Sequence, residues 1–180
     1  MNKNLLKAFR FLIYIAEIFL IYIFSKIPGF DLRIEKTSSL LLVPLFVVIT
    51  VFEQEYASLF FGALIGLFLD LEISGMVGPQ TAALCFIGFA VGVLTTYFLN
   101  PNFLTTLICG AVLTPLLVIF NYFLKSIFWD FVFSSRNFYN YVFPSVVYTF
   151  LLILPAFLFN RPIFYFFSER NGAERIGRLR

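Results

Sequence analysis

The sequence contains no histidine, one tryptophan and two cysteines in 180 residues, and only 13% of its residues are charged. Without histidine, no serine or cysteine nucleophile can be activated by an imidazole, and no histidine metal site can form. Cys85 and Cys109 both lie in apolar runs, where a free cysteine behaves as a small hydrophobic residue. No glycine-rich phosphate loop with a lysine follows a strand. We therefore expect a protein without enzyme activity, metal, cofactor or disulfide.

Hydrophobic residues are abundant: they make up 61% of the chain, which includes 27 phenylalanines. Soluble domains contain roughly 45–50% apolar residues, so this composition indicates an integral membrane protein. A spanning helix needs roughly 20 residues, which leaves room for about six. The apolar runs predict spans at Phe9–Ile27, Ser39–Phe52, Tyr56–Leu71, Pro79–Leu99, Phe103–Leu124 and Tyr141–Phe159. The second and third are short, which is typical of re-entrant segments or of helices that tilt little.

This pattern predicts an all-α fold with one transmembrane domain at residues 1–168 and a basic tail at residues 169–180. Residues 125–140 form the longest predicted connection, and their aromatic side chains favour a place at the membrane surface. The tail either sets the orientation of the chain or contacts anionic lipid or a filament.

Basic residues flank the first and last spans. They are Lys3, Lys7 and Arg10 at one end, and Arg161, Arg170, Arg175, Arg178 and Arg180 at the other. Because lysine and arginine concentrate on the cytoplasmic side, both termini are predicted to be cytoplasmic, which requires an even number of spans. Glu53 and Glu55 disagree with this scheme, since their loop would be cytoplasmic without a basic residue beside it in the sequence.

Small residues recur at helical spacing in the third and fourth segments. Gly62, Gly66 and Asp70 fall at i, i+4 and i+8, and therefore share one helix face. Gly88 and Gly92 repeat the spacing in the next helix. Such spacing lets two helix backbones approach closely in lipid, either within a hairpin or against a partner helix. Asp70 ends its span, where it can reach interfacial water or accept hydrogen bonds from amides of the turn that follows.

Glu17 lies inside the first predicted span, where an ionisable residue is by default a candidate functional site. Arg10 is seven positions away, about 10 Å along the helix, which is too far for a tight pair. Asn121 or Lys125 could supply a partner from another helix. Two interpretations are open: a carboxyl that faces the bundle interior, protonated or not, and a substrate or proton site.

These residues carry a resemblance to a known family. The run from Gly62 through Gly66 to Asp70, the stretch "GPQTAAL" from Gly78, and the helix with Gly88 and Gly92 resemble the rod shape-determining protein MreD family. The resemblance implies six spans in the bacterial cytoplasmic membrane, with a fold like that of the substrate-binding components of energy-coupling-factor transporters.

The function that this resemblance implies is that of a non-catalytic scaffold for cell elongation and peptidoglycan synthesis. Such a protein contacts membrane lipids and no nucleic acid, binds MreC, and is linked indirectly to MreB, to RodA and to its penicillin-binding partner. Gly62, Gly66 and Asp70 would then hold the hairpin geometry or the MreC contact, supported by Gly78, Gly88 and Gly92.

A vitamin-type transporter component is the alternative, because the same architecture can hold a small ligand. Such components often carry an Ala-x3-Ala motif on the first helix. Here Ala8 and Ala16 are eight positions apart with no alanine between them, which weakens the alternative.

Overall fold

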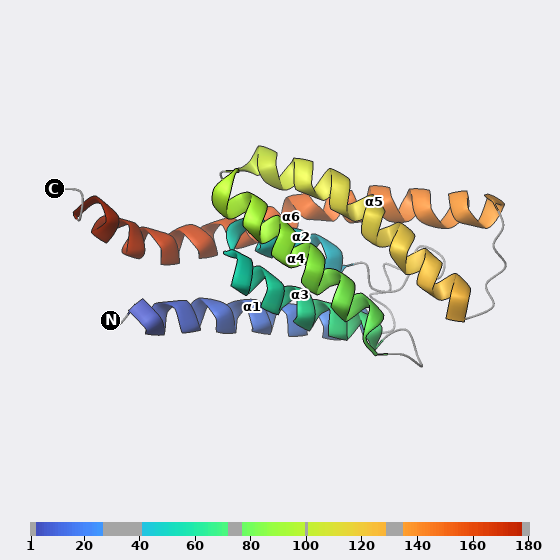
Figure 1. Ribbon diagram of the computed structural model, residues 1–180, viewed down its shortest axis with the longest axis horizontal. Coiled ribbons are helices and arrows are strands. Elements are labelled where there is room, and N and C mark those ends of the chain that lie inside the picture. The colour runs from blue at the N-terminus through green and yellow to red at the C-terminus, as the bar shows by residue number, and fades with distance from the viewer. Residues whose placement is uncertain (1–2, 27–40, 72–76, 100, 129–134, 178–180) are drawn as a thin grey trace.

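The computed structural model describes residues 3–26, 41–71, 77–99, 101–128 and 135–177, and within these ranges its regular elements are all helices (Figure 1). The helices are α1 (Lys3–Lys26), α2 (Leu42–Phe52), α3 (Glu55–Asp70), α4 (Pro79–Tyr97), α5 (Phe103–Phe128) and α6 (Ser135–Gly177). The predicted all-α fold is confirmed.

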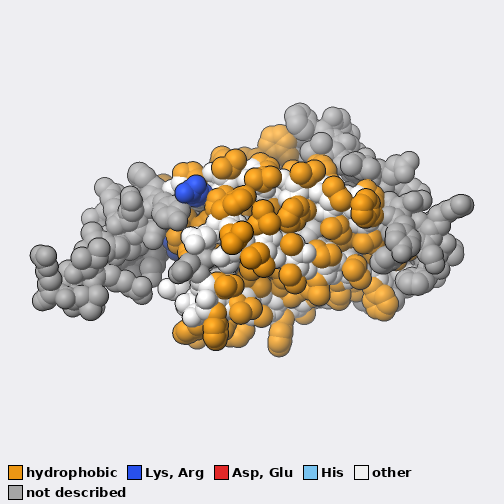
Figure 2. Space-filling model, turned by 90° about the horizontal axis from the view of Figure 1, so that it is seen from above, with side chains coloured by type: hydrophobic (Ala, Val, Ile, Leu, Met, Phe, Trp, Pro, Cys, Tyr) orange, Lys and Arg blue, Asp and Glu red, His pale blue; other side chains and the backbone are white. Residues whose placement is uncertain are grey.

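Four of these helices are long and apolar enough to cross a membrane. The apolar windows are Ala8–Ser25, Pro79–Tyr97, Phe103–Leu124 and Val142–Phe164. The hydrophobic side chains of these helices also cover the outer surface: Figure 2 shows them over most of one long side, with basic side chains at one end. A surface of this kind is suited to lipid, so the structure describes a membrane protein.

The second and third predicted spans are the helices that fall short of this length. Helix α2 has 11 residues and α3 has 16, so they extend about 16 Å and 24 Å, against a hydrocarbon core of about 30 Å. Four of the six predicted spans therefore correspond to helices that are long and apolar enough to cross a membrane.

Helix α2 is the centre of the bundle. Each of its residues from Leu42 to Phe52 is buried, and it contacts α1, α3, α4, α5 and α6. Its sequence, LVPLFVVITVF, is hydrophobic on every face, which is the pattern of a helix enclosed by others. The short apolar run in the sequence is therefore a core helix of the protein.

Helix α6 differs most from its predicted bounds. The sequence predicted a span at Tyr141–Phe159, whereas the helix has 43 residues and is about 65 Å long. It continues past position 168, so the predicted boundary between domain and tail lies inside a helix. The prolines at 144, 155 and 162 do not end it, because in an apolar bundle neighbouring groups and local adjustments can satisfy the freed carbonyls.

The predicted connection at residues 125–140 is also shorter than expected. Helix α5 continues to Phe128 and α6 begins at Ser135, while residues 129–134 lie outside the described residues. In Figure 1 the first residues of α1 and the last turns of α6 lie at the same end of the bundle.

Candidate functional site

Helices α3 and α4 form an antiparallel hairpin with their glycines in the contact. A Cβ atom on Gly66 would lie 2.5 Å from the Cα of Thr81, and one on Gly88 would lie 2.6 Å from the carbonyl oxygen of Ser58. On Gly62 it would overlap the carbonyl oxygen of Leu84. These distances are shorter than van der Waals contact, and each obstructing atom belongs to the backbone of the facing helix.

Gly92 completes the series near the other end of the hairpin. Its added Cβ would lie 2.7 Å from the Cα of Glu55 and 3.0 Å from the Cβ of Ser58. All four glycines of the sequence pattern thus face the other helix of their own hairpin. Of the two packing roles that the spacing left open, the described structure places them in the internal one.

Asp70 joins the two helices at their connected end. Its Oδ2 accepts hydrogen bonds from the backbone N–H of Gly78 (2.8 Å) and of Thr81 (3.0 Å), and from the Thr81 hydroxyl (2.6 Å). Its Oδ1 accepts a hydrogen bond from the backbone N–H of Gln80 (3.0 Å). The side chain is almost fully buried, so it does not reach interfacial water. Instead it caps the free amides at the start of α4, where a helix favours negative charge.

Gly78 allows the chain to enter α4 at this point. Its φ is +136°, a backbone conformation that glycine adopts without the steric cost of a Cβ. No atom lies within 4 Å of its hypothetical Cβ, so the requirement comes from the backbone angle alone. Pro79 follows at the first turn of the helix, where its missing N–H costs nothing.

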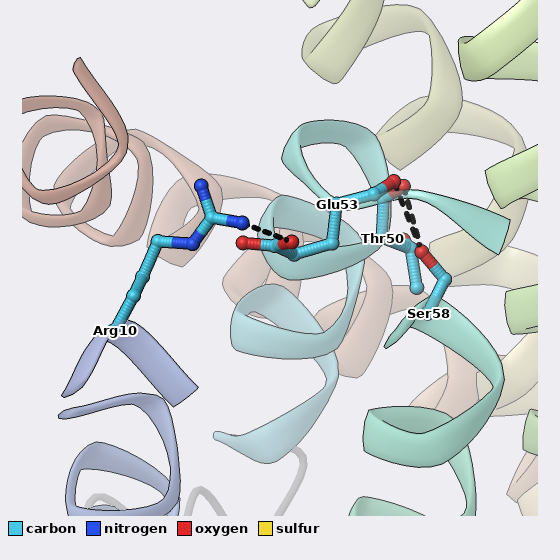
Figure 3. Close-up of polar contacts among 4 residues, drawn as sticks. All are labelled: Arg10, Thr50, Glu53 and Ser58. Carbon is cyan, nitrogen blue, oxygen red and sulfur yellow. Dashed lines mark hydrogen bonds and ion pairs between the residues drawn. The ribbon is translucent and has the colours of Figure 1, made fainter. Parts of the chain in front are cut away.

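Hydroxyl groups from the hairpin contact the last turn of α2, and Figure 3 shows the contacts of Ser58. The Ser58 hydroxyl lies 3.3 Å from the carbonyl oxygen of Thr50 and 3.2 Å from that of Glu53. The Thr95 hydroxyl lies 3.4 Å from the same Thr50 carbonyl. Helix ends leave carbonyl groups without intrahelical partners, and here the Ser58 hydroxyl of α3 supplies a donor, while the Thr95 hydroxyl is shared with carbonyl groups of its own helix. The hairpin is thereby joined to the central helix by polar contacts as well as by packing.

Arg10 and Glu53 form an ion pair between α1 and the end of α2 (Figure 3). The Arg10 Nη2 lies 2.8 Å from the Glu53 Oε2, and the two side chains are 12% and 3% exposed. The guanidinium also lies 5.5 Å from the centre of the Phe164 ring of α6. No basic residue lies beside Glu53 in the sequence, and the structure supplies one from a helix 43 positions earlier in the chain.

Glu17 is paired with Asn160 of α6, not with Asn121 or Lys125. The Asn160 Nδ2 donates a hydrogen bond of 3.0 Å to the Glu17 Oε1 and another of 3.0 Å to the carbonyl oxygen of Ala156. Asn160 is fully buried. Sequence reasoning missed this residue, although an asparagine inside an apolar helix is the signal that identifies such a contact.

Large aromatic side chains connect α1 to α3. The rings of Phe11 and Tyr14 meet the Phe61 ring edge to face, with centroids 5.3 Å and 5.5 Å apart. Further along, Tyr22 lies against Phe68 with a centroid distance of 4.7 Å. Within the residues the structure describes, no three histidine, cysteine, aspartate or glutamate side chains gather, so no set of metal ligands can be named there.

The comparisons with known proteins add no relative: no family model matches the chain, and no curated protein or solved structure matches it. The fold and these contacts define the class of the protein. It is a helical membrane protein in which four helices of spanning length surround a buried central helix. Among the described residues, several of its polar contacts join one helix to another.

Proposed function

We propose that this protein is a non-catalytic membrane scaffold of the MreD type, which binds an MreC-like single-span protein in the bacterial cytoplasmic membrane. Through that partner it would be linked to MreB filaments, to RodA and to its penicillin-binding partner. Both of its termini would lie in the cytoplasm.

The observation that carries the proposal is the closely packed α3–α4 hairpin. The residues on which the MreD resemblance rests, from Gly62 to Gly92, come together in one structural element, where glycines allow backbone contact and Asp70 caps the second helix. A scaffold needs a surface of fixed shape, and close helix contact with a buried cap provides one. Because the glycines face inward, the partner would meet the outer side of the hairpin, where Phe60 and Phe86 are exposed.

Photo-crosslinking in the native membrane tests this proposal. A crosslinking amino acid replaces Phe60 or Phe86 on the hairpin, and Leu116 on the exposed side of α5 serves as the matched control. We expect the two hairpin positions to crosslink to an MreC-like protein and the control position to react mainly with lipid. Crosslinks from Leu116 alone would place the partner on another face, and no MreC crosslink from any position would contradict the proposal.

Purification in mild detergent, followed by mass spectrometry of proteins and small molecules, separates this proposal from the transporter alternative. An MreC-like partner at a constant ratio supports the scaffold. An ATPase module together with a bound vitamin-sized molecule would instead assign the chain to a transporter.

A further inference from the structure

The Glu17–Asn160 contact leaves two oxygen atoms without a partner. Asn160 uses its Nδ2 for both of its hydrogen bonds, and its Oδ1 is buried with no donor in reach. The Glu17 Oε2 is buried in the same way. A buried polar atom without a hydrogen bond costs free energy, and a buried carboxylate without compensation costs far more.

Exchanging the positions of the oxygen and nitrogen of the Asn160 amide does not give these two oxygens a partner. The flipped amide would place its oxygen against the Glu17 Oε1 and against the carbonyl oxygen of Ala156, and all three atoms are acceptors. The orientation in the structure gives both of these acceptors a donor. A proton on Glu17 itself supplies the missing donor.

We propose that Glu17 is protonated on Oε2 and forms a neutral acid–amide pair with Asn160, which makes this contact a proton-binding site between α1 and α6. One proton taken from water forms the O–H bond. The acid then accepts a hydrogen bond from the Asn160 Nδ2 and can donate one to the Oδ1 on the same amide. A single proton thus makes the unpartnered Oε2 a donor and gives the unpartnered Oδ1 a hydrogen bond to accept, and no other bond changes.

Comparison with the neighbouring Arg10–Glu53 pair explains why the carboxyls of Glu17 and Glu53 have different partners. Arg10 lies two positions inside the apolar window Ala8–Ser25, and Glu17 lies about 10 Å deeper along the same helix. Charge becomes more costly with depth in a bilayer. Arg10 is engaged with Glu53 at 2.8 Å and lies over the Phe164 ring. The shallow carboxyl therefore has a cation as partner, and the deep one has an amide.

Matched glutamine substitutions test the proposal in the full chain. Glu17→Gln replaces the acid O–H by an N–H and keeps both hydrogen bonds, so we expect a Tm within about 2 °C of the wild-type value. Glu53→Gln has the same change in atoms but removes the charge that pairs with Arg10, and should lower the Tm by more than that. A loss of Tm in Glu17→Gln as large as that in Glu53→Gln would overturn the proposal.

Infrared spectroscopy of the protein in lipid vesicles detects the proton directly. The spectrum of the wild-type protein should contain the C=O stretching band of a protonated carboxylic acid, which Glu17→Gln removes and Glu53→Gln retains. Asn160→Leu should shift this band, because it removes the hydrogen bond to the acid carbonyl. The proposal fails if the band is absent from the wild-type spectrum, or if the substitutions at positions 17 and 160 leave it unchanged.

Discussion

The contact between α3 and α4 is made by backbone, whereas α1 is held against the bundle by large side chains. In the hairpin, the hypothetical Cβ of each glycine meets atoms of the facing helix at or below van der Waals distance. At α1, the rings of Phe61 and Phe68 lie between the helices, and an ion pair and an acid–amide contact are added at the α2 and α6 sides. A backbone contact therefore leaves no space for an added atom, whereas a side-chain contact can adjust to a smaller or differently shaped group.

The largest effect is expected where a side chain is forced into the backbone contact. Gly66→Leu must separate α3 from α4 at Thr81, and should lower the free energy of unfolding by about 3 kcal/mol or more. Unfolding in mixed micelles with increasing dodecyl sulfate, followed by circular dichroism, measures this value. Ala90→Leu adds a leucine at an exposed position of α4 and should have little effect. Equal stability of the two variants would show that the glycine contact is not as close as described.

Removal of the cap should have the next largest effect. Asp70→Ala leaves the amides of Gly78, Gln80 and Thr81 without their acceptor, and should cost about 2 kcal/mol. Asp70→Asn retains one acceptor oxygen and should cost less than the alanine variant. The same unfolding measurement applies, and hydrogen exchange at the start of α4 should rise in both variants. Unchanged exchange there would rule out the capping role.

A smaller effect is expected at the side-chain contact of α1. Phe61→Leu removes the ring that meets Phe11 and Tyr14, but leucine fills part of the space, so we expect a loss of about 1 kcal/mol. Phe86→Leu makes the same change on a side chain that is 81% exposed, and serves as the control. If Phe61→Leu destabilised the protein as much as Gly66→Leu, the distinction between the two kinds of contact would not hold.

The smallest effect is expected for a change that preserves charge. Arg10→Lys keeps the ion pair with Glu53 and replaces the planar guanidinium over Phe164 by an ammonium group, which should cost about 0.5 kcal/mol. Arg10→Gln, which removes the charge, should cost more. The order of these two variants in the same unfolding assay checks the assignment, and the reverse order would contradict it.

Local patterns in the sequence predicted the hairpin well, because helical spacing fixes which residues share a face. The stretch from Gly62 to Pro79 was sufficient to predict three features. These are the shared face of the glycines, the proline at the start of α4, and hydrogen bonds from backbone amides to Asp70. The spacing could not decide whether the glycines met a helix of the same chain or of a partner, since both need the same small residues.

The contacts of α1 could not be predicted in this way. Glu17 and Asn160 are 143 positions apart, and Arg10 and Glu53 are 43 apart. Hydropathy identifies the helices that carry these residues but contains no information about which helices become neighbours. The bounds of α6 were missed for a different reason, because prolines and charged residues that end helices in water do not have to end them in a membrane protein.

The enclosed position of α2 has a consequence for biosynthesis. A helix of 11 residues is too short to be held in the bilayer as a span by its own length, and it enters the core only when other helices surround it. Two of its neighbours, α5 and α6, leave the ribosome after α2, α3 and α4. The centre of this protein therefore closes only after α6 has been made, and a chain cut before α6 would leave α2 without one of the helices that bury it.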